Sequence, residues 1–141
     1  MNITYRKSEA KDMPFILDML AKFSGDIQDI IPNQFLVAED EGKIVGCVRI
    51  RNIEGHLKLA SIIVLPDYRK KRIGSNLVTK IINENPEKPI YLFCHKENDG
   101  FYAKLGFKVA EINNIPEVFK KSSFAKSDET VINMVFQIIA D

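Results

Sequence analysis

The chain has 141 residues, of which 45% are hydrophobic and 28% are charged, and its formal net charge is +1. A chain of this length is expected to form one domain, residues 1–141, and to bury roughly 68–70% of its unfolded surface. The near-zero net charge argues against a protein that binds nucleic acid through its overall charge. No apolar run approaches the ~20 residues of a membrane span, and the polar N-terminal residues do not resemble a signal peptide, so we expect a cytoplasmic protein with no membrane partner.

The two cysteines, Cys47 and Cys94, lie in apolar runs that are typical of strands, and they form no C-x-x-C motif. We therefore expect buried free thiols, with neither a disulfide nor a metal site. No repeat or low-complexity segment divides the chain.

The N-terminal part of the chain predicts a strand followed by helical segments. Apolar and polar residues alternate over residues 2–6, as in a half-buried strand. A helix follows and begins at Ser8 or at Asp12. Pro14 favours the later start, because proline is tolerated only in the first turn of a helix. Residues 26–31 predict a short second helix.

Three apolar runs then predict an antiparallel meander over residues 35–39, 44–51 and 57–65. Residues 40–43, Asp-Glu-Gly-Lys, form the first hairpin turn, where glycine supplies a positive φ. Residues 52–55 contain the second turn.

Two arginines share one face of the middle strand of this meander. Arg49 and Arg51 alternate with Val48 and Ile50, so both side chains project from the same side. They are either solvated or face an anionic group, such as the carboxylate of a substrate. The solvated arrangement is favoured.

The stretch 62–81 predicts a short buried strand, a basic turn and a helix. Pro66 ends the strand, because proline cannot donate to a sheet. Four consecutive basic residues, Arg69, Lys70, Lys71 and Arg72, precede Gly74 at the start of the helix. A helix N-terminus presents unpaired N–H groups, so basic side chains and a glycine there can form a phosphate site. An ordinary strand–turn–helix with a solvated turn explains the pattern equally well.

The C-terminal half predicts a parallel crossover followed by shorter elements. The helix ends near residues 83–85, and the apolar strand 89–94 that follows is expected to lie parallel to the strand before the helix. The remaining predicted elements, in chain order, are a short helix capped by Asn98 or Asp99 and closed by Gly106, a strand at 107–112, a loop at 113–128 with a helical turn at 117–121, and a strand at 131–139.

Two motifs resemble the hallmarks of the GNAT superfamily of N-acetyltransferases. The first consists of Val64, Pro66, Tyr68, Arg69, Ile73 and Gly74, and the second is the run F-Y-A-K-L-G-F at residues 101–107. The resemblance implies an α+β (α/β three-layer) GNAT fold, in which about four helices flank a mixed, strongly twisted sheet of about six or seven strands. Residues 92–121 are similar, more weakly, to acetyltransferase domains of the N-acetylglutamate synthase type.

The resemblance implies acetyl-CoA as the co-substrate and no metal. In the family's pyrophosphate loop, the backbone N–H groups at the start of the helix hold the CoA diphosphate, and basic side chains add charge. The matching positions here are Arg69, Lys70, Lys71, Arg72, Ile73, Gly74 and Ser75. Arg72 stands where the family has glycine. Its side chain either strains a backbone of positive φ or points to solvent or to the 3′-phosphate of CoA.

The resemblance also implies which residues bind the pantetheine arm and the acyl group of acetyl-CoA. The family's pantetheine arm lies between the strand that ends at Pro66 and the strand at residues 90–93, against Ile62, Ile63 and Val64. The Val64 N–H then stabilises the oxyanion, and Tyr102 protonates the departing CoA thiolate. Asn98 is a further expected cofactor contact.

The general base is not assigned. Lys58 stands where many relatives carry a glutamate, and Glu54, His56, Asp67 and Glu117 are the alternatives. A lysine is a poor base unless it is desolvated, so the pattern favours an amine of low pKa or a proton relayed by water.

Three functions remain open at this stage. The leading one is acetyl transfer to a small-molecule or peptide amine, with no nucleic-acid partner. A second is an acyl-CoA-binding sensor or subunit without catalysis, and a third takes residues 69–72 as a nucleic-acid patch. The acceptor, the use of longer acyl-CoAs and a homodimer are left undecided.

Overall fold

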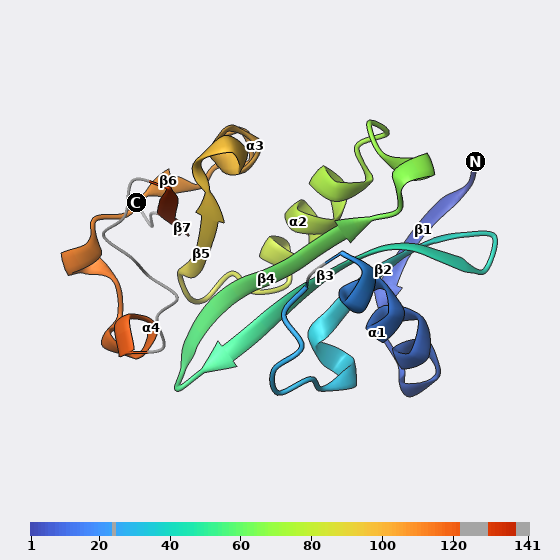
Figure 1. The fold of residues 1–141 in the computed structure, drawn as a ribbon, viewed down its shortest axis with the longest axis horizontal. Helices are drawn as coiled ribbons and strands as arrows, with labels where there is room; N and C mark the ends of the chain where they lie inside the picture. Colours follow the sequence, from blue (N-terminus) through green and yellow to red (C-terminus); the bar gives the residue numbers. More distant parts are fainter. Residues whose placement is uncertain (24, 122–129, 138–141) are drawn as a thin grey trace. The chain divides into compact units, whose positions relative to one another are not determined.

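The structure, a computed structural model, describes residues 1–23, 25–121 and 130–137. In these residues it contains a seven-stranded sheet and four α-helices, with short 3-10 turns between them (Figure 1). The strands are β1 (Ile3–Lys7), β2 (Phe35–Asp40), β3 (Lys43–Ile53), β4 (His56–Val64), β5 (Ile90–His95), β6 (Lys108–Val109) and β7 (Val131–Phe136). The helices are α1 (Met13–Lys22), α2 (Ile73–Asn83), α3 (Asp99–Lys104) and α4 (Glu117–Lys121). The predicted α+β class, the element order and the size of the sheet are confirmed.

The sheet is mixed, and its strand order is β1-β2-β3-β4-β5-β7-β6. β2 pairs antiparallel with β1 and β3, and β7 pairs antiparallel with β5 and β6. β4 and β5 pair in parallel, at Leu57 with Ile90 and at Lys58 with Tyr91. The parallel pair confirms the predicted crossover through α2, because two strands joined by one helix run the same way.

The chain divides into two compact units, which are described separately below. The first unit comprises residues 1–51 and 59–84, and the second comprises residues 52–58 and 85–141. The first three residues of β4 therefore belong to the second unit and the rest of the strand to the first. That residues 1–141 act as one domain stays a prediction.

In the first unit, α1 and α2 cover opposite faces of β3 (Figure 1). Cys47 lies in the core cluster that contains Ile16 and Leu20 of α1. Its neighbour Gly46 faces the other way, where an added Cβ would lie 3.3 Å from Leu77 of α2. Successive residues of a strand point to opposite faces, so the small Gly46 lets α2 approach β3 closely.

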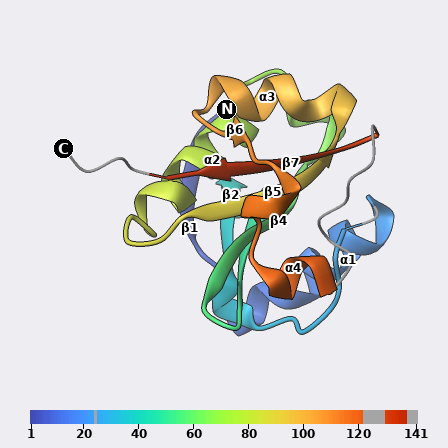
Figure 2. The same ribbon diagram turned by 90° about the vertical axis from the view of Figure 1, so that its left-hand side faces the viewer.

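In the second unit, α3 and α4 lie on opposite sides of β5 and β7 (Figure 2). Phe119 of α4 is fully buried, and its ring contacts Tyr91 and Phe93 of β5 with centroids 5.5 and 5.3 Å apart. Ile115 completes this cluster. A buried aromatic ring brings a large apolar area, which fixes the five-residue α4 against the sheet despite its short length.

Two predicted elements differ from the structure, and a third is described only in part. Residues 26–31 form no helix, because three backbone carbonyls there accept hydrogen bonds from Arg49. The strand predicted at 107–112 is limited to β6, since Ile112 instead enters a 3-10 turn that packs on the Phe119 cluster. The last predicted strand is confirmed over 131–136, whereas residues 138–139 lie outside the described part.

Cys47 is buried and Cys94 half-buried, and both are free thiols, as predicted. None of the helices in the described ranges has the length and apolar character that crossing a membrane requires. Within the same ranges, no three or more His, Cys, Asp or Glu side chains gather into a group that would hold a metal ion.

Candidate active site

At the end of β4, two backbone N–H groups point away from β3, toward the other edge of the strand. Leu65, the next residue, donates its N–H to the Val45 carbonyl of β3 at 2.9 Å. Because peptide groups alternate in direction along a strand, the Val64 N–H points to the opposite edge, as does that of Ile62. Both N–H groups are therefore directed away from β3. Ile63 lies between them, and its buried side chain joins the α1 core.

The loop after β4 is tied down by its first residues. The Tyr68 hydroxyl donates to the Asp40 carboxylate at 2.8 Å. Arg69 donates its Nε to the Val64 carbonyl at 2.9 Å, and its guanidinium stacks 5.5 Å from the centre of the Phe23 ring. The exposed Arg69 side chain thus anchors the loop through internal contacts, in addition to any effect of its charge on a bound anion.

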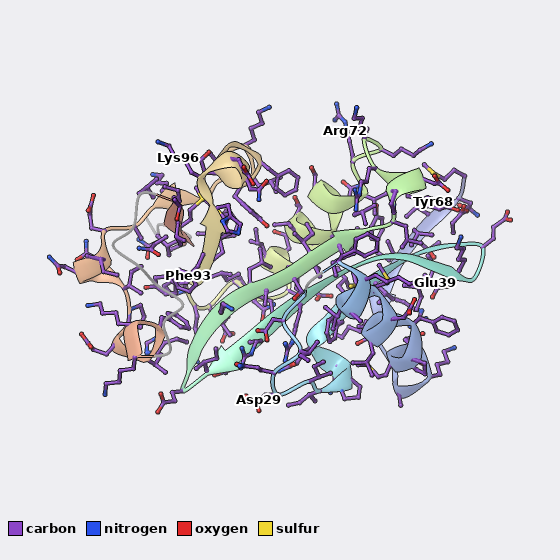
Figure 3. All side chains as sticks on the ribbon, viewed as in Figure 1. Asp29, Glu39, Tyr68, Arg72, Phe93 and Lys96 are labelled. Carbon is purple, nitrogen blue, oxygen red and sulfur yellow. The ribbon has the colours of Figure 1, made fainter. Side chains whose placement is uncertain are left out.

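The rest of the loop has the backbone geometry of an anion site. Lys70 and Arg72 have φ of 64° and 65°, in the left-handed region, and Arg72 is the N-cap of α2. A left-handed residue followed by a helical one turns successive N–H groups toward one point, where the helix dipole is positive. The side chains of residues 69–72 are exposed, and Figure 3 shows that of Arg72 pointing away from the ribbon.

Both features expected of Arg72 are observed together: its φ is positive, and its side chain is exposed to solvent. A non-glycine residue in this region carries a strain of roughly 1 kcal/mol. Glycine avoids that strain, so the departure from the family pattern should lower the free energy of unfolding by a measurable amount.

In the second unit, Tyr102 of α3 lies half-buried between two other aromatic rings. Its ring centroid is 5.1 Å from that of Phe101 and 5.9 Å from that of Phe107. Burial raises the pKa of Tyr102 to about 12, and the nearby Cys94 thiol adds to the rise. The phenol therefore keeps its proton at neutral pH, as a proton donor must.

The ends of α3 agree only in part with the predicted caps. Gly106 has φ of 104° and follows the last turn, as predicted. Asn98 is the N-cap residue, but its side chain makes no capping hydrogen bond, so the prediction of a side-chain cap is wrong for this residue. Asn98 is exposed, and a contact with the cofactor stays a prediction.

The expectation that Arg49 and Arg51 are solvated is wrong. The Arg49 side chain is fully buried and that of Arg51 is 7% exposed. Arg49 donates to the carbonyls of Asp26, Gln28 and Asp29 and to the side chain of Gln34. Burial lowers the pKa of Arg49, with Asp26 opposing the change. The two arginines do share a face, as predicted, and the anionic group that they meet is internal.

Known proteins identify this fold. The family model described as the acetyltransferase (GNAT) domain matches residues 32–109. The chain belongs to the GNAT family. This assignment confirms the predicted family, and the matched residues include the basic loop and Tyr102.

Three relatives illustrate the range of GNAT proteins that resemble this chain. Spermidine N(1)-acetyltransferase of Thermoplasma acidophilum is 27% identical over 93 residues, which cover 62% of this chain and 58% of the relative. N-acetylglutamate synthase from Neisseria gonorrhoeae, solved with coenzyme A and N-acetyl-glutamate, superposes with a TM-score of 0.81 at 16% identity, over 99% of this chain and 36% of that one. The PaiA N-acetyltransferase from Thermoplasma acidophilum, solved with coenzyme A, gives a TM-score of 0.68 at 19% identity, over 98% and 100% of the chains.

These likenesses show a common fold. The chain spans 58% of the length of the spermidine acetyltransferase and about a third of the N-acetylglutamate synthase chain. What each relative binds or acetylates is a property of that relative.

The candidate bases of this GNAT chain have different surroundings. Lys58 is buried, and it pairs with Tyr91 of β5. His56 is exposed and packs edge-on against Phe119, with ring centroids 6.1 Å apart. Glu117 accepts a hydrogen bond from Lys120 at 3.2 Å. Glu54, at a left-handed turn position, and Asp67 are both exposed. These surroundings do not select a base.

A cavity of about 700 Å³ opens in the first unit, between α1, the β2–β3 hairpin and the residues after β4. Phe15, Met19 and Phe23 form its apolar wall, and Leu65 and Pro66 form one edge. Charged residues around it contact one another, as Arg6 does with Asp12 and Lys22 with Asp18. These mutual pairs leave the cavity without a clear charge preference for a ligand.

Sequence reasoning missed Ser61, which has φ of 48° within β4. Its Oγ accepts the backbone N–H of Asp26 at 2.9 Å. This contact ties the segment after α1 to β4 one residue before Ile62. No local feature of the sequence signals Ser61. The position of the segment itself had a signal in charge complementarity, because the acids of 26–29 match the two arginines of β3.

Proposed function

We propose that the chain is an N-acetyltransferase that moves an acetyl group from acetyl-CoA to a primary amine, by direct attack in a ternary complex. The observation that carries the proposal is the left-handed turn at Lys70 and Arg72, which opens α2 directly after β4. This turn offers converging N–H groups and basic side chains to a diphosphate. Coenzyme A in the PaiA and N-acetylglutamate synthase structures and the activity named for the spermidine relative support the choice of ligand.

In this proposal the loop holds the CoA diphosphate through the N–H groups of Lys71, Ile73, Gly74 and Ser75, with Lys70 adding charge. The thioester lies along residues 62–64, and its carbonyl oxygen accepts the Val64 N–H, with the Ile62 N–H oriented the same way. The amine nitrogen attacks the carbonyl carbon, and the oxyanion of the tetrahedral intermediate is stabilised by these donors. The C–S bond then breaks and releases CoA as a thiolate.

Tyr102 donates a hydrogen bond, and then its proton, to the departing sulfur. A pKa of about 12 makes Tyr102 a weaker acid than an ordinary tyrosine, so the sulfur must itself be a strong base when the proton moves. Burial also raises the pKa of a thiol, as the higher pKa of Cys94 illustrates in this unit. The pKa of a desolvated CoA thiol is therefore closer to the pKa of Tyr102 than the pKa of a thiol in water is.

The acceptor amine loses its proton without an assigned base. With Lys58 in the position where many relatives have glutamate, the proposal favours an amine of low pKa, such as the α-amine of an amino acid or peptide. A cytoplasmic location stays a prediction, and whether the chain forms a homodimer stays open.

The test is the release of CoA from acetyl-CoA with a panel of amines. Replacing Tyr102 by phenylalanine should lower kcat by roughly 10²–10⁴-fold, because the ring and its packing stay while the proton donor is lost. Tyr91→Phe is the matched control, since Tyr91 is also a half-buried tyrosine whose pKa burial raises, and it should change kcat little.

Two outcomes would support other functions. CoA binding without turnover on any amine would favour the acyl-CoA sensor, a reading that Lys58 keeps open. Binding of nucleic acid at low salt that CoA does not displace would favour the nucleic-acid patch at residues 69–72.

A further inference from the structure

The segment that follows α1 is held to β3 by two arginines in two different ways. Arg49 donates mainly to neutral groups, the backbone carbonyls of Asp26, Gln28 and Asp29. Arg51 instead meets carboxylates, with Nη1 2.8 Å from Oδ2 of Asp26 and Nη2 3.2 Å from Oδ2 of Asp29. Arg49 thus shapes the backbone of the segment, whereas Arg51 is a carboxylate-binding group.

The two carboxylates on Arg51 are not equivalent. The Asp26 side chain is 21% exposed, and its backbone N–H is bound to Ser61. The Asp29 side chain is 87% exposed, and its backbone lies in the left-handed region with φ of 50°. An ion pair with a solvent-exposed carboxylate adds little stability. Asp29 is therefore the partner that a carboxylate from solution can replace.

The 26–29 segment contacts β4 next to the residues proposed to bind the thioester. Ser61, which accepts the Asp26 N–H, directly precedes Ile62, whose own N–H points to the edge of β4 proposed for the thioester. Arg51 lies on the same face of β3 as Arg49, the face that packs against α1 through Cys47. The contact at Ser61 thus holds the start of this segment, at Asp26, against β4 one residue before Ile62.

We propose that Arg51 binds the carboxylate of the acceptor, and that Asp29 occupies this guanidinium until the acceptor replaces it. The proposal rests on the proposed function and names its substrate class: a primary amine that also carries a carboxylate, as an amino acid does. Exchange of one carboxylate for another keeps two positive and two negative charges around Arg49 and Arg51. The planar fork of an arginine favours such carboxylate recognition.

The experiment compares acceptors that differ by one carboxylate. Phenylalanine is paired with phenylalaninamide, lysine with lysinamide, and leucine with leucinamide, which keep the α-amine and lack the carboxylate, and spermidine is added as a polyamine. The wild-type protein should acetylate at least one amino acid with a kcat/KM about tenfold or more above that of its amide. Asp29→Asn should lower the KM for that amino acid by about 2–5-fold, since the competing carboxylate is gone, and leave the KM for the amide unchanged.

Asp18→Asn is the matched control, because Asp18 is also an exposed carboxylate in an ion pair, with Lys22 at 3.1 Å. It should leave every KM unchanged. Arg51→Gln should lower kcat/KM for the amino acid by about tenfold or more, and by a clearly larger factor than for the amine without a carboxylate. Because Arg51 is buried, this variant is first checked by circular dichroism, and the Asp29→Asn result stands without it.

Preference for the amines without a carboxylate, or an equal effect of Asp29→Asn on both members of a pair, would overturn the carboxylate site and leave the acetyltransferase intact. Absence of turnover on every amine would instead contradict the proposed function. Calorimetry then decides the carboxylate site separately: phenylalanine, lysine or leucine must bind the protein, and bind the Asp29→Asn variant more tightly. If none of the three binds, the site is wrong.

Discussion

Two groups of basic residues in the first unit have opposite surroundings. Arg49 and Arg51 on β3 are buried, and their guanidinium groups contact the segment at residues 26–29. Lys70 and Arg72, in the loop before α2, are exposed. The comparison shows that a positive charge is buried where the same unit supplies acceptors for it, whereas the loop keeps its charges at the surface, where the proposed function places an external anion.

The backbone differs between the two groups in a matching way. The β3 arginines lie on a regular strand, and the strain falls on their partner Asp29, whose φ is positive. In the loop, the basic residues themselves carry the left-handed φ values. Strain in the loop shapes the proposed anion site, whereas strain at Asp29 brings a carboxylate to Arg51.

Replacing Arg49 by methionine is the change with the largest expected effect on this comparison. Loss of the buried guanidinium removes the donor that the carbonyls of Asp26, Gln28 and Asp29 share, whereas the Gln34 side chain still accepts the Ile31 N–H. The free energy of unfolding should fall by about 3–5 kcal/mol, measured by urea denaturation.

Arg72→Met is the control from the other group and should change the free energy of unfolding by less than about 0.5 kcal/mol, because Arg72 is exposed. If both methionine variants unfold at the same urea concentration, the distinction between the internal and the external group is wrong.

The sequence predicted the loop better than the β3 arginines, for a physical reason. Strand alternation correctly placed Arg49 and Arg51 on one face, but burial of that face depends on residues 26–29, which are far away in the sequence and were expected to be helical. The features of the loop are local: Pro66, the basic run and the helical spacing from Ile73 lie within a few residues of one another. Local patterns are visible in a sequence, whereas the partner of a buried charge depends on tertiary contacts.

The same reasoning explains the other outcomes. The turn at residues 40–43 and the end of α3 at Gly106 follow from glycines with positive φ, and both were predicted. Ser61 has a positive φ without being glycine, and nothing in its neighbourhood in the sequence signals it. Arg72 was recognised as a departure from the family pattern, but only the structure shows that its φ is positive.

The loss of stability at acid pH is a prediction with an effect of intermediate size. It concerns Asp12 and Arg6, which form another ion pair within the first unit. Hydrogen bonding to Arg6 is the largest cause that lowers the pKa of the Asp12 carboxyl to about 2, from 3.8. A lowered pKa means that the carboxylate stabilises the fold above pH 3.8, and that this contribution is lost as the pH falls through about 4 toward 2. The loss should be on the order of 2 kcal/mol, measured by urea denaturation across that range.

Asp12→Asn should be less stable at pH 7 and should lose less stability than the wild type on acidification. Asp18→Asn, at an exposed ion pair, should keep the acid limb of the wild type. If Asp12→Asn loses as much stability at acid pH as the wild type, the ion pair of Asp12 with Arg6 does not explain the acid sensitivity of this unit.

The smallest expected effect distinguishes the strain of the loop from its function. Glycine at position 72 adopts a φ of 65° without the steric cost of a side chain, so Arg72→Gly should raise the free energy of unfolding by up to about 1 kcal/mol. The same change removes a positive charge beside the proposed diphosphate site, so the Kd for CoA, measured by calorimetry, should rise by about 2–5-fold.

Arg72→Ala separates the two effects, because it loses the charge and keeps the strain. It should weaken CoA binding as much as Arg72→Gly does, without the gain in stability. If glycine instead tightens CoA binding, the loop gains more from a relaxed backbone than from the arginine charge, and Arg72 does not contribute to the anion site.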